Sequence, residues 1–573
     1  MSEGGSITSP APTTTLGGYL AARIAQTGIT DFFGVPGDYN LVLLDELLKQ
    51  PGLRMVGCCN ELNAGYAADG YARVRGFSAV VVTYMVGATS LLNSTAGSYS
   101  DDLPVLVVSG GPNTNDAPAR RILHHTIGEK DVDQASKCFE PVVRKTFVIR
   151  HLDDATTMID EALTLCLRDR KPVYLEVACN LAGARVPAPG PMSFPPARTP
   201  SDPASLKAAV DAALAHLTAA VKPVLLAGVK LAPAGAQDSF EKLANALGCA
   251  VAVMPNAKGL FRENHPGFVG TYWGAVSSED CAEVIESSDC QIIAGPIFND
   301  YTTTGWTALI HHNKAITADP DRVTVTGTRF HNVRLDDFLT TLAARVSRKE
   351  ASLLAYRRLH ENPAQPPLAA TDTPLSLREL RAQVQHLLDA RSHIVVETGD
   401  SWFNGQKLTL PAGAGYHFQM QYGSIGWCTG ATLGVSIGAG PARRVIALIG
   451  DGSFQVTAQE VSTMIRYHVN PIIFLLNNRG YTIEVEIHDG PYNNIKNWDY
   501  AGLIQVFNAG EGNGLGLKAT TSAELTAAVE RARHHTGLVL IECALDRDDC
   551  TRELLEWGSR VASANSRPPA SPG

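Results

Sequence analysis

The chain has 573 residues, of which 45% are hydrophobic and 18% are charged, and its formal net charge is −9. This length predicts three or four domains of ~150 residues, and the composition is that of a folded globular protein rather than a disordered one. The acidic balance and the lack of a basic block argue against nucleic acid as a partner.

The cysteine pattern and the N-terminus bear on location. None of the eleven cysteines is in a Cys-x-x-Cys pattern, and an odd number of unpatterned thiols is typical of a reducing cytoplasm. The first dozen residues are polar and lack the charged start and apolar run of a signal peptide. No apolar stretch reaches the ~20 residues of a membrane span, so a membrane partner is not expected.

Two proline-rich segments, 187–203 and 361–374, cannot hold a helix or a central strand and are interpreted as linkers. They leave three blocks: 13–186, 204–345 and 374–573. Strand-like runs and helical patterns alternate in each block, so we predict an α/β fold of three doubly wound parallel-sheet domains. The first and third blocks repeat the same order of elements, which suggests a duplication; the runs are 79–84, 88–98, 105–109, 445–449, 453–467 and 472–476.

Two acids in the first block follow strand-like runs. Asp38, in the string Gly-Asp-Tyr-Asn, comes shortly after Phe32-Phe33, and by itself it is typical of a turn or a helix cap. Glu61 follows the apolar run 55–59 and opens a helix of small residues, where an acid in the first turn is favoured by the helix dipole. The functional alternative for Glu61 is a carboxyl in an apolar setting that shares a proton with a ligand.

The adjacent His124 and His125 form the next polar feature. Neighbouring residues in a helix diverge by about 100°, so this pair is poorly arranged for one metal ion. The pair therefore belongs either to a surface loop or to a proton-transfer site, because imidazole titrates near neutrality.

Near the C-terminus, the run Ile-Gly-Asp-Gly-Ser at 449–453 is followed downstream by Asn477-Asn478. The pattern predicts a strand over 444–449, a helix over 453–467 with an apolar face formed by Val456, Val461, Met464 and Ile465, and a second strand over 471–476. Such a unit crosses over right-handedly, which brings the ends of its two strands to one edge of a sheet.

The strand ends of this unit predict a metal site. Asp451 and Asn478 end two parallel strands, where open α/β sheets place ligands. One carboxylate and one amide oxygen, with a backbone carbonyl near Gly480, suit Mg²⁺, which commonly bridges a diphosphate. No lysine follows the glycines, so this is not a Walker loop, and the metal must offset the phosphate charge.

The stretch from Gly450 to Glu484 resembles the cofactor motif of thiamine diphosphate enzymes, and of the pyruvate decarboxylase family in particular. Similarity extends from about residue 13 to the C-terminus through the strings GDYN, PIFNDYTTTGW, ETGDSWFN, QYGSIGW and HDGPYNNIKNWDY. The resemblance implies thiamine diphosphate and Mg²⁺ as cofactors and assigns catalytic roles to Asp38, Glu61, His124, His125 and Glu484.

The same resemblance implies how the cofactor is bound. Glu61 would promote the imino form of the pyrimidine, Ile425 would wedge the cofactor into a V shape, and the Gly423 carbonyl would bind the aminopyrimidine. Metal ligands would be Asp451, Asn478 and Gly480, and the cofactor-binding set would be Glu61, Thr398, Gly423, Ile425, Gly450, Asp451, Gly452, Ser453, Asn478 and Tyr481.

The implied reaction is the non-oxidative decarboxylation of a 2-oxo acid. The positions that line the substrate pocket in pyruvate-specific members of the family are bulky here, which favours pyruvate and release of acetaldehyde; these are Tyr301, Trp402, Ile483 and Ile487. Alternatives are a decarboxylase of larger or aromatic 2-oxo acids, an acetolactate-type carboligase, and a catalytically silent protein on the same fold.

The resemblance also implies a homotetramer built as a dimer of dimers. Each active site would lie between the first block of one chain and the third block of another. Some members carry a cysteine pair after the first strand of the middle domain, linked to substrate activation; here Lys230 and Leu231 stand at those positions. That route is therefore not expected, although Cys249, Cys281 and Cys290 leave others open.

Overall fold

The computed structural model describes residues 12–195, 198–360 and 371–568. It divides into two compact units. The first unit contains the chain up to residue 198 together with 429–440 and 459–467, and the second unit contains the remaining residues. The centre of each predicted linker, at 196–197 and at 361–370, lies outside the described residues.

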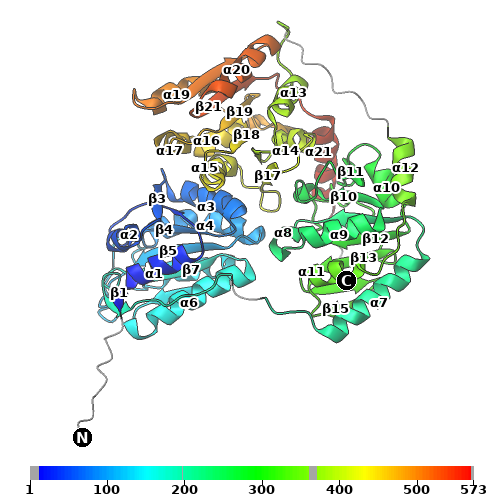
Figure 1. The fold of residues 1–573 in the computed structure, drawn as a ribbon. Helices are drawn as coiled ribbons and strands as arrows, with labels where there is room; N and C mark the ends of the chain where they lie inside the picture. Colours follow the sequence, from blue (N-terminus) through cyan, green and yellow to red (C-terminus); the bar gives the residue numbers. More distant parts are fainter. Residues whose placement is uncertain (1–11, 196–197, 361–370, 569–573) are drawn as a thin grey trace. The chain divides into compact units, whose positions relative to one another are not determined.

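The first unit is built on a parallel sheet whose strand order is β3-β2-β4-β5-β7-β6 (Figure 1). Every residue of the two central strands is buried, as expected for a sheet that is covered on both faces. The strands are β2 (Asp31–Gly34), β3 (Arg54–Gly57), β4 (Ser78–Val82), β5 (Val105–Gly111), β6 (Thr146–Ile149) and β7 (Val173–Ala178).

Helices connect these strands: α1 (Leu16–Gln26), α2 (Leu41–Leu48), α3 (Glu61–Arg75), α4 (Val86–Ser100), α5 (Gln134–Phe139) and α6 (Leu152–Asp169). The small residues of α3 permit close packing, because a β-carbon at Gly65 would clash with Ser94 of α4. A separate short pair, β1 (Thr13–Thr15) with β8 (Arg185–Pro187), joins the two ends of this segment.

The second unit contains two sheets within the described residues. The sheet of the predicted middle block has the order β11-β10-β9-β12-β13-β14-β15. Its strands are β9 (Pro223–Ala227), β10 (Ala250–Val253), β11 (Phe268–Thr271), β12 (Cys290–Ala294), β13 (Ala315–Asp319), β14 (Arg322–Val325) and β15 (Thr328–His331). Its helices are α7 (Pro203–Ala219), α8 (Leu231–Ala234), α9 (Gln237–Leu247), α10 (Cys281–Glu286), α11 (Leu335–Ala343) and α12 (Ala351–Leu359).

One edge of this sheet departs from the wholly parallel arrangement that the sequence predicts. β13, β14 and β15 pair antiparallel, because two-residue turns join them and a parallel crossover needs a much longer connection. The turn between β14 and β15 places Thr326 and Gly327 at positive φ (45° and 94°), as a tight hairpin requires.

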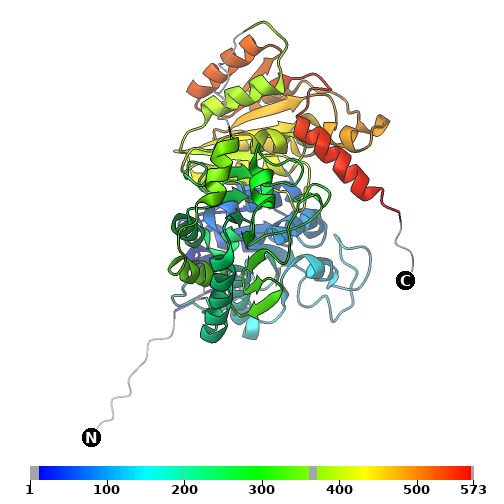
Figure 2. The same ribbon diagram turned by 90° about the vertical axis from the view of Figure 1, so that its right-hand side faces the viewer.

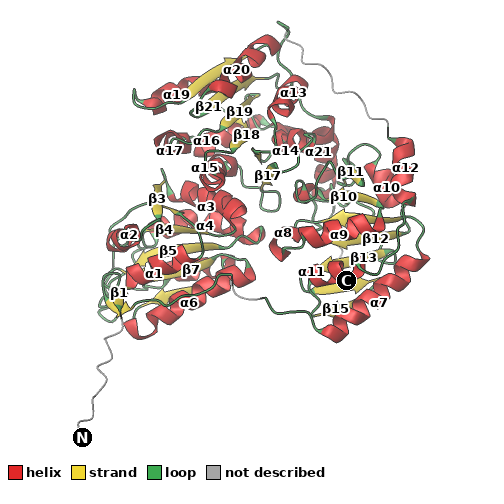
Figure 3. Cartoon of the chain, viewed as in Figure 1, coloured by secondary structure: helices red, strands yellow, loops and turns green. Residues whose placement is uncertain are grey.

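The other sheet of the second unit has the order β17-β16-β18-β19-β21-β20, and all its pairs are parallel. When the strands of each sheet are ranked by their position along the chain, the two sheets have the same spatial order of strands. The repeated sequence pattern of the first and third blocks predicts this similarity. Helices flank the strands, red against yellow in Figure 3. The strands are β16 (Ser392–Val396), β17 (Gly415–Phe418), β18 (Arg444–Gly450), β19 (Ile472–Asn477), β20 (Leu515–Ala519) and β21 (Val539–Ala544).

The helices that follow these strands carry or support the candidate site. α21 is the red helix that leads to the C-terminus in Figure 2. The bounds are α13 (Leu377–Leu387), α14 (Asp400–Gln406), α15 (Trp427–Ala439), α16 (Asp451–Thr457), α17 (Glu460–Arg466), α18 (Thr482–Ile487), α19 (Tyr500–Asn508), α20 (Ser522–His534) and α21 (Arg552–Asn565).

The predicted helix over 453–467 differs from the structure. It consists of two helices, α16 and α17, which belong to different units. Val461, Met464 and Ile465 are buried as expected, whereas Val456 is 42% exposed and does not share their buried face. One helical period cannot continue across the break at residues 458–459, so the prediction for Val456 was wrong.

None of the helices in the described ranges has the combination of length and apolar character that a membrane crossing needs.

Candidate active site

The second unit brings Asp451 and Asn478 together at the ends of neighbouring strands. Gly450, the last residue of β18, pairs with Leu476 of the parallel strand β19. Asp451 then opens α16, and Asn478 follows β19 directly. The predicted βαβ geometry at this edge is confirmed.

A carboxylate, a side-chain amide and a backbone carbonyl meet at this point. In the orientation that satisfies its hydrogen bonds, the side-chain NH₂ of Asn478 donates to the Gly480 carbonyl oxygen (3.0 Å) and to Oδ1 of Asp451 (3.3 Å), while its Oδ1 accepts from Oγ1 of Thr482 (2.5 Å). The Asp451 carboxylate and the Gly480 carbonyl thus face the same amide group, and if this amide turned over it would present its oxygen beside both of them. A carboxylate, an amide oxygen and a carbonyl facing a common point are the ligands that a hard divalent cation prefers.

The Asp451 carboxylate is fixed before any cation binds. It is 1% exposed and accepts hydrogen bonds from the backbone amides of Gly452 (2.8 Å) and Arg479 (2.7 Å). Burial is the main influence and raises the pKa of Asp451 to about 6, whereas the amide hydrogen bonds lower it. A cation at this point would favour the ionised carboxylate.

These residues lie in the wall of a cavity of about 220 Å³ within the second unit. The cavity includes thirteen positions assigned by the sequence: Tyr301, Thr398, Gly423, Ile425, Gly450, Asp451, Gly452, Ser453, Asn478, Gly480, Tyr481, Ile483 and Glu484. It also includes five that the sequence interpretation missed: Gly399, Asp400, Ser401, Leu476 and Thr482.

Two predicted pocket residues do not line this cavity. Trp402 is fully buried and packs edge-on against Tyr301, with ring centroids 5.9 Å apart. Ile487 is partly buried at the end of α18. Trp402 therefore acts on the pocket through Tyr301, whose ring also contacts Trp557 of α21 at 4.9 Å.

The first unit assembles a different polar group. Asp38 Oδ2 lies 2.6 Å from Nε2 of His124, and Asp38 Oδ1 lies 3.4 Å from Nε2 of His125. All three side chains are exposed, and the His124 ring stacks on Tyr39 at 4.9 Å. The histidines are not helical, since His125 adopts a positive φ of 63°. The helix-based argument for diverging side chains therefore does not apply, and the turn directs both rings toward one carboxylate.

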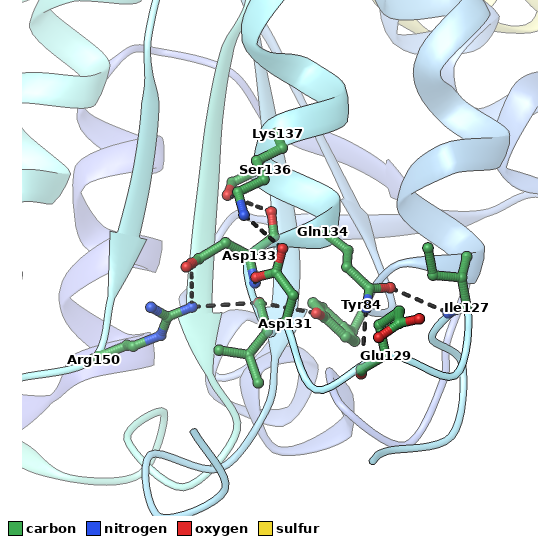
Figure 4. A network of polar contacts seen from close by, with 10 residues as sticks. Tyr84, Ile127, Glu129, Asp131, Asp133, Gln134, Ser136, Lys137 and Arg150 are labelled. Atoms are coloured by element: carbon green, nitrogen blue, oxygen red, sulfur yellow. Dashed lines mark hydrogen bonds and ion pairs between the residues drawn. The ribbon is translucent and has the colours of Figure 1, made fainter. Parts of the chain in front are cut away.

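A network of hydrogen bonds holds the segment that follows the two histidines (Figure 4). The side chain of Gln134 accepts from the Ile127 amide (3.1 Å) and donates to the Glu129 carbonyl (3.4 Å). Arg150 donates to the carboxylate of Asp133 (2.6 Å). This loop is thus pinned to α5 and to the end of β6.

Glu61 occupies the first position of α3, as predicted. The N-cap side chain of Asn60 accepts from the Asn63 amide at 2.8 Å. Glu61 is half-buried, and its carboxylate lies against Gly87 of α4. A β-carbon at Gly87 would come within 3.1 Å of Oε1 of Glu61. A residue that the sequence interpretation missed supports this turn: fully buried Glu460 accepts from the Cys59 amide at 3.2 Å.

Two buried carboxyls were also missed: Asp400, which lines the cavity, and Glu397, which is next to the lining residue Thr398. Glu397 accepts only backbone hydrogen bonds, and burial raises its pKa to about 7. Asp400 accepts from Oγ1 of Thr551 at 2.7 Å, and burial raises its pKa to about 6. The sequence contains a feature that could have indicated both acids. The string Glu-Thr-Gly-Asp places them directly after the apolar run that forms β16.

Comparison with known families follows the same division of the chain. The family model described as "Thiamine pyrophosphate enzyme, N-terminal TPP binding domain" matches residues 14–136. The models of the central domain and of the C-terminal TPP binding domain of the same enzymes match residues 210–341 and 397–543. Together these ranges cover more than half of the sequence. The chain therefore belongs to the thiamine pyrophosphate enzyme family.

Individual relatives narrow this class. The chain is 52% identical over 568 residues to "Pyruvate decarboxylase 2" of Oryza sativa subsp. japonica, covering 98% of this chain and 94% of that one. It is 51% identical over 562 residues to "Pyruvate decarboxylase 1" of Arabidopsis thaliana, covering 97% and 92%. The protein belongs to the pyruvate decarboxylase family.

A solved structure supports the fold at lower sequence identity. The thiamine diphosphate-dependent 4-hydroxybenzoylformate decarboxylase of Rhodococcus jostii aligns with a TM-score of 0.75 at 20% identity, covering 94% of this chain and all of that one. This likeness concerns the architecture alone.

Proposed function

We propose that the protein catalyses the non-oxidative decarboxylation of pyruvate to acetaldehyde and carbon dioxide, with thiamine diphosphate and Mg²⁺. The single observation that carries the proposal is the convergence of Asp451, Asn478 and the Gly480 carbonyl on one point inside the cavity. Membership of the pyruvate decarboxylase family supplies the substrate class.

The residues present fit the cofactor. Mg²⁺ would be held by Asp451, Asn478 and the Gly480 carbonyl, and it would offset the charge of the diphosphate. Gly452 keeps the wall open at this end, since a β-carbon there would collide with the Tyr481 ring at 2.4 Å. The rings of the cofactor would be contacted by Thr398, Gly423 and Ile425. The remaining contacts would come from Gly450, Ser453 and Tyr481.

When bound, thiamine diphosphate would accept the electron pair that is left when the bond between the carboxylate and the carbonyl carbon of the substrate breaks. The protein's own groups hold and move protons. Glu61 would share a proton with the pyrimidine ring, and the Asp38–His124–His125 cluster would bring a proton to the product. Glu484, at the rim of the cavity, would act as the acid beside the departing carboxylate.

The size of the cavity favours a short substrate. Tyr301 and Ile483 line it, and the fully buried Trp402 prevents the Tyr301 ring from moving back. We expect Ile483→Ala and Trp402→Ala to widen acceptance toward longer 2-oxo acids. Unchanged relative rates for pyruvate and 2-oxohexanoate in both variants would contradict the pocket assignment.

The two groups of residues lead to a proposal about assembly. Asp38, Glu61, His124 and His125 belong to the first unit, and Asp451, Asn478 and Glu484 belong to the second. We propose that the first unit of one subunit and the second unit of another complete each site, in a homotetramer that is a dimer of dimers. The domain boundaries 13–186, 204–345 and 374–573 are part of the same proposal. A fully active monomer would contradict it.

A reducing cytoplasm is the compartment that we propose. All eleven cysteines lie within the described ranges, and none of them is in a disulfide.

Product analysis tests the proposed reaction. Purified protein should convert pyruvate to acetaldehyde and carbon dioxide only when thiamine diphosphate and Mg²⁺ are both added. Acetolactate as the main product would instead favour a carboligase, and preference for phenylpyruvate would favour a decarboxylase of aromatic acids. Cofactor binding without gas release would indicate a silent member of the fold.

A further inference from the structure

Glu397, the residue directly after β16, is a buried carboxylate held only by backbone amides. It is 0% exposed and does not itself line the cavity. Its Oε1 accepts from the Thr398 amide at 2.9 Å, and its Oε2 accepts from the amides of Gly426 (3.1 Å) and Cys428 (3.0 Å). Within the described residues, no basic side chain forms a hydrogen bond or an ion pair with Glu397.

A carboxyl in this setting is costly to retain. Burying a charge without a counter-charge is unfavourable, and burial accordingly raises the pKa of Glu397 to about 7. All three of its hydrogen-bond partners are donors, so the ionised form is the one that satisfies them. An apolar residue would fill the space but would leave the amides of Thr398, Gly426 and Cys428 without this acceptor.

The amides of Gly426 and Cys428 border the turn that precedes α15. This turn contains Gly423 and Ile425, both in the cavity wall. Gly423 and Gly426 have positive φ values of 64° and 86°, and a β-carbon at Gly426 would come within 2.9 Å of Val456. Glycine is therefore favoured at both positions, and the backbone conformation of the turn depends on these two glycines.

A second hydrogen bond holds the same turn. Oγ1 of Thr457, in α16, donates to the Gly426 carbonyl at 2.7 Å. The amide of Gly426 is thus fixed by Glu397 and its carbonyl by Thr457. The other oxygen of Glu397 holds Thr398, which is also part of the cavity wall. One carboxylate joins two walls of the cavity.

We infer that Glu397 is a positioning residue: its carboxylate fixes the 423–426 turn relative to Thr398, and thereby sets the direction in which the Gly423 carbonyl and the Ile425 side chain meet the bound cofactor. The inference rests on the proposed function for the identity of that cofactor. Glu397 itself does not line the cavity, and its hydrogen bonds do not involve Asp451, Asn478 or Gly480.

The test is Glu397→Gln in the holoenzyme. The amide keeps the size of the side chain but sets its NH₂ group against at least one backbone amide. We expect kcat for pyruvate to fall by ~100-fold, the cost of misplacing reacting groups by about 1 Å, with KM little changed. The dissociation constant of thiamine diphosphate, measured by calorimetry in Mg²⁺, should change by less than about threefold because the cation cluster is intact.

A spectroscopic readout separates positioning from general damage. The near-ultraviolet circular dichroism of bound thiamine diphosphate reports the environment of its aminopyrimidine ring, and its band should be lost or shifted in Glu397→Gln. Thr457→Val, which removes the grip on the Gly426 carbonyl, should shift the same band and provides an independent test if Glu397→Gln does not fold.

Glu263→Gln is the matched control. Glu263 is also a buried carboxylate, but it accepts from Lys258 (2.6 Å) and from the Leu410 amide (2.9 Å), and it does not line the cavity. This control should keep the wild-type dichroism band even if its stability falls.

The inference would be overturned by wild-type dichroism and kcat in both Glu397→Gln and Thr457→Val. It would equally be overturned by a loss of cofactor affinity greater than tenfold with an unchanged band. Failure of the proposed function has a different signature, because the wild-type protein itself would then release no acetaldehyde.

Discussion

The two sheets with the same strand order, one in each unit, use the same strand ends for different chemistry. β2 of the first unit and β16 of the second hold equivalent places in their sheets, and each is followed by a Gly-Asp pair four residues on. Asp38 is exposed and contacts two histidines, whereas Asp400 is buried and accepts from Thr551. Equivalent backbone positions therefore carry an exposed carboxylate beside two histidines in one sheet and a buried, hydrogen-bonded carboxylate in the other.

The third strand of each sheet shows the same contrast. β18 is followed at once by Asp451, which faces the amide of Asn478, while β4 is followed by Thr83 and Tyr84. The first sheet thus offers no carboxylate where the second has its candidate cation ligand. Topology fixes where ligands meet the sheet, and the residues at the strand ends decide which ligand is bound.

We expect the largest effect on activity from a substitution of Asp38, the exposed acid of the first sheet. Asp38→Asn removes the charge that both histidines face, so we expect kcat to fall by about 10²–10⁴-fold, the usual contribution of a general acid–base group. Cofactor affinity should be unchanged. Steady-state and calorimetric measurements check this, with the exposed Asp45→Asn in α2 as control. A decrease in kcat of less than threefold would rule out a proton-transfer role for Asp38.

The equivalent substitution in the second sheet should act on stability instead. In Asp400→Asn, the new NH₂ group faces Oγ1 of Thr551 or Nδ2 of Asn404, which now donate to the carboxylate. We expect a loss of ~1–3 kcal/mol in the free energy of unfolding, seen as a lower Tm. Asp38→Asn should leave Tm nearly unchanged because its side chain is about half exposed. Equal Tm shifts in the two variants would remove the distinction between them.

The raised pKa of Glu397 predicts that the stability of the folded protein decreases as the pH rises. Burial raises its folded-state pKa from 4.5 to about 7, so its contribution to stability is complete below pH ~4.5 and is lost as the pH rises through 7. A difference of one between the folded-state and unfolded-state pKa corresponds to ~1.4 kcal/mol of stability. The cofactor-free wild type should therefore lose more stability between pH 5 and 8 than Glu397→Gln does. Parallel unfolding curves for the two proteins over this range would show that the carboxyl is not desolvated.

A smaller effect is expected from loosening the loop after the histidines. Gln134→Met removes the hydrogen bonds to Ile127 and Glu129 but keeps the length of the side chain. We expect kcat to fall by about tenfold as His124 and His125 lose their fixed orientation. Hydrogen exchange of the 126–133 amides should rise in parallel, and a fall in kcat with unchanged exchange would show that Gln134 does not act through this loop.

Much of this arrangement follows from local sequence. The strand before Asp451 and the strand before Asn478 are apolar runs that end at glycine or asparagine, so the sequence pattern correctly predicts that these two residues lie at the ends of neighbouring strands. The same reasoning failed for Val456, because a break between two helices leaves no mark in an apolar periodicity. It also missed Glu397, since the partners that hold this acid are backbone amides with no residue signature. The histidine pair lies on a turn, which a helix-based argument cannot represent.

The central claim is that Asp451, Asn478 and the Gly480 carbonyl hold the cation that anchors the cofactor. Its most direct test is calorimetric titration of thiamine diphosphate in Mg²⁺ into the wild type and into Asp451→Ala, with Asp389→Ala, an exposed acid at the opposite ends of the strands, as control. We predict tight, Mg²⁺-dependent binding to the wild type and to Asp389→Ala, and a loss of affinity of at least ~100-fold in Asp451→Ala. Binding of equal strength in all three proteins, or binding that does not depend on Mg²⁺, would show that these three oxygens do not hold the anchoring cation.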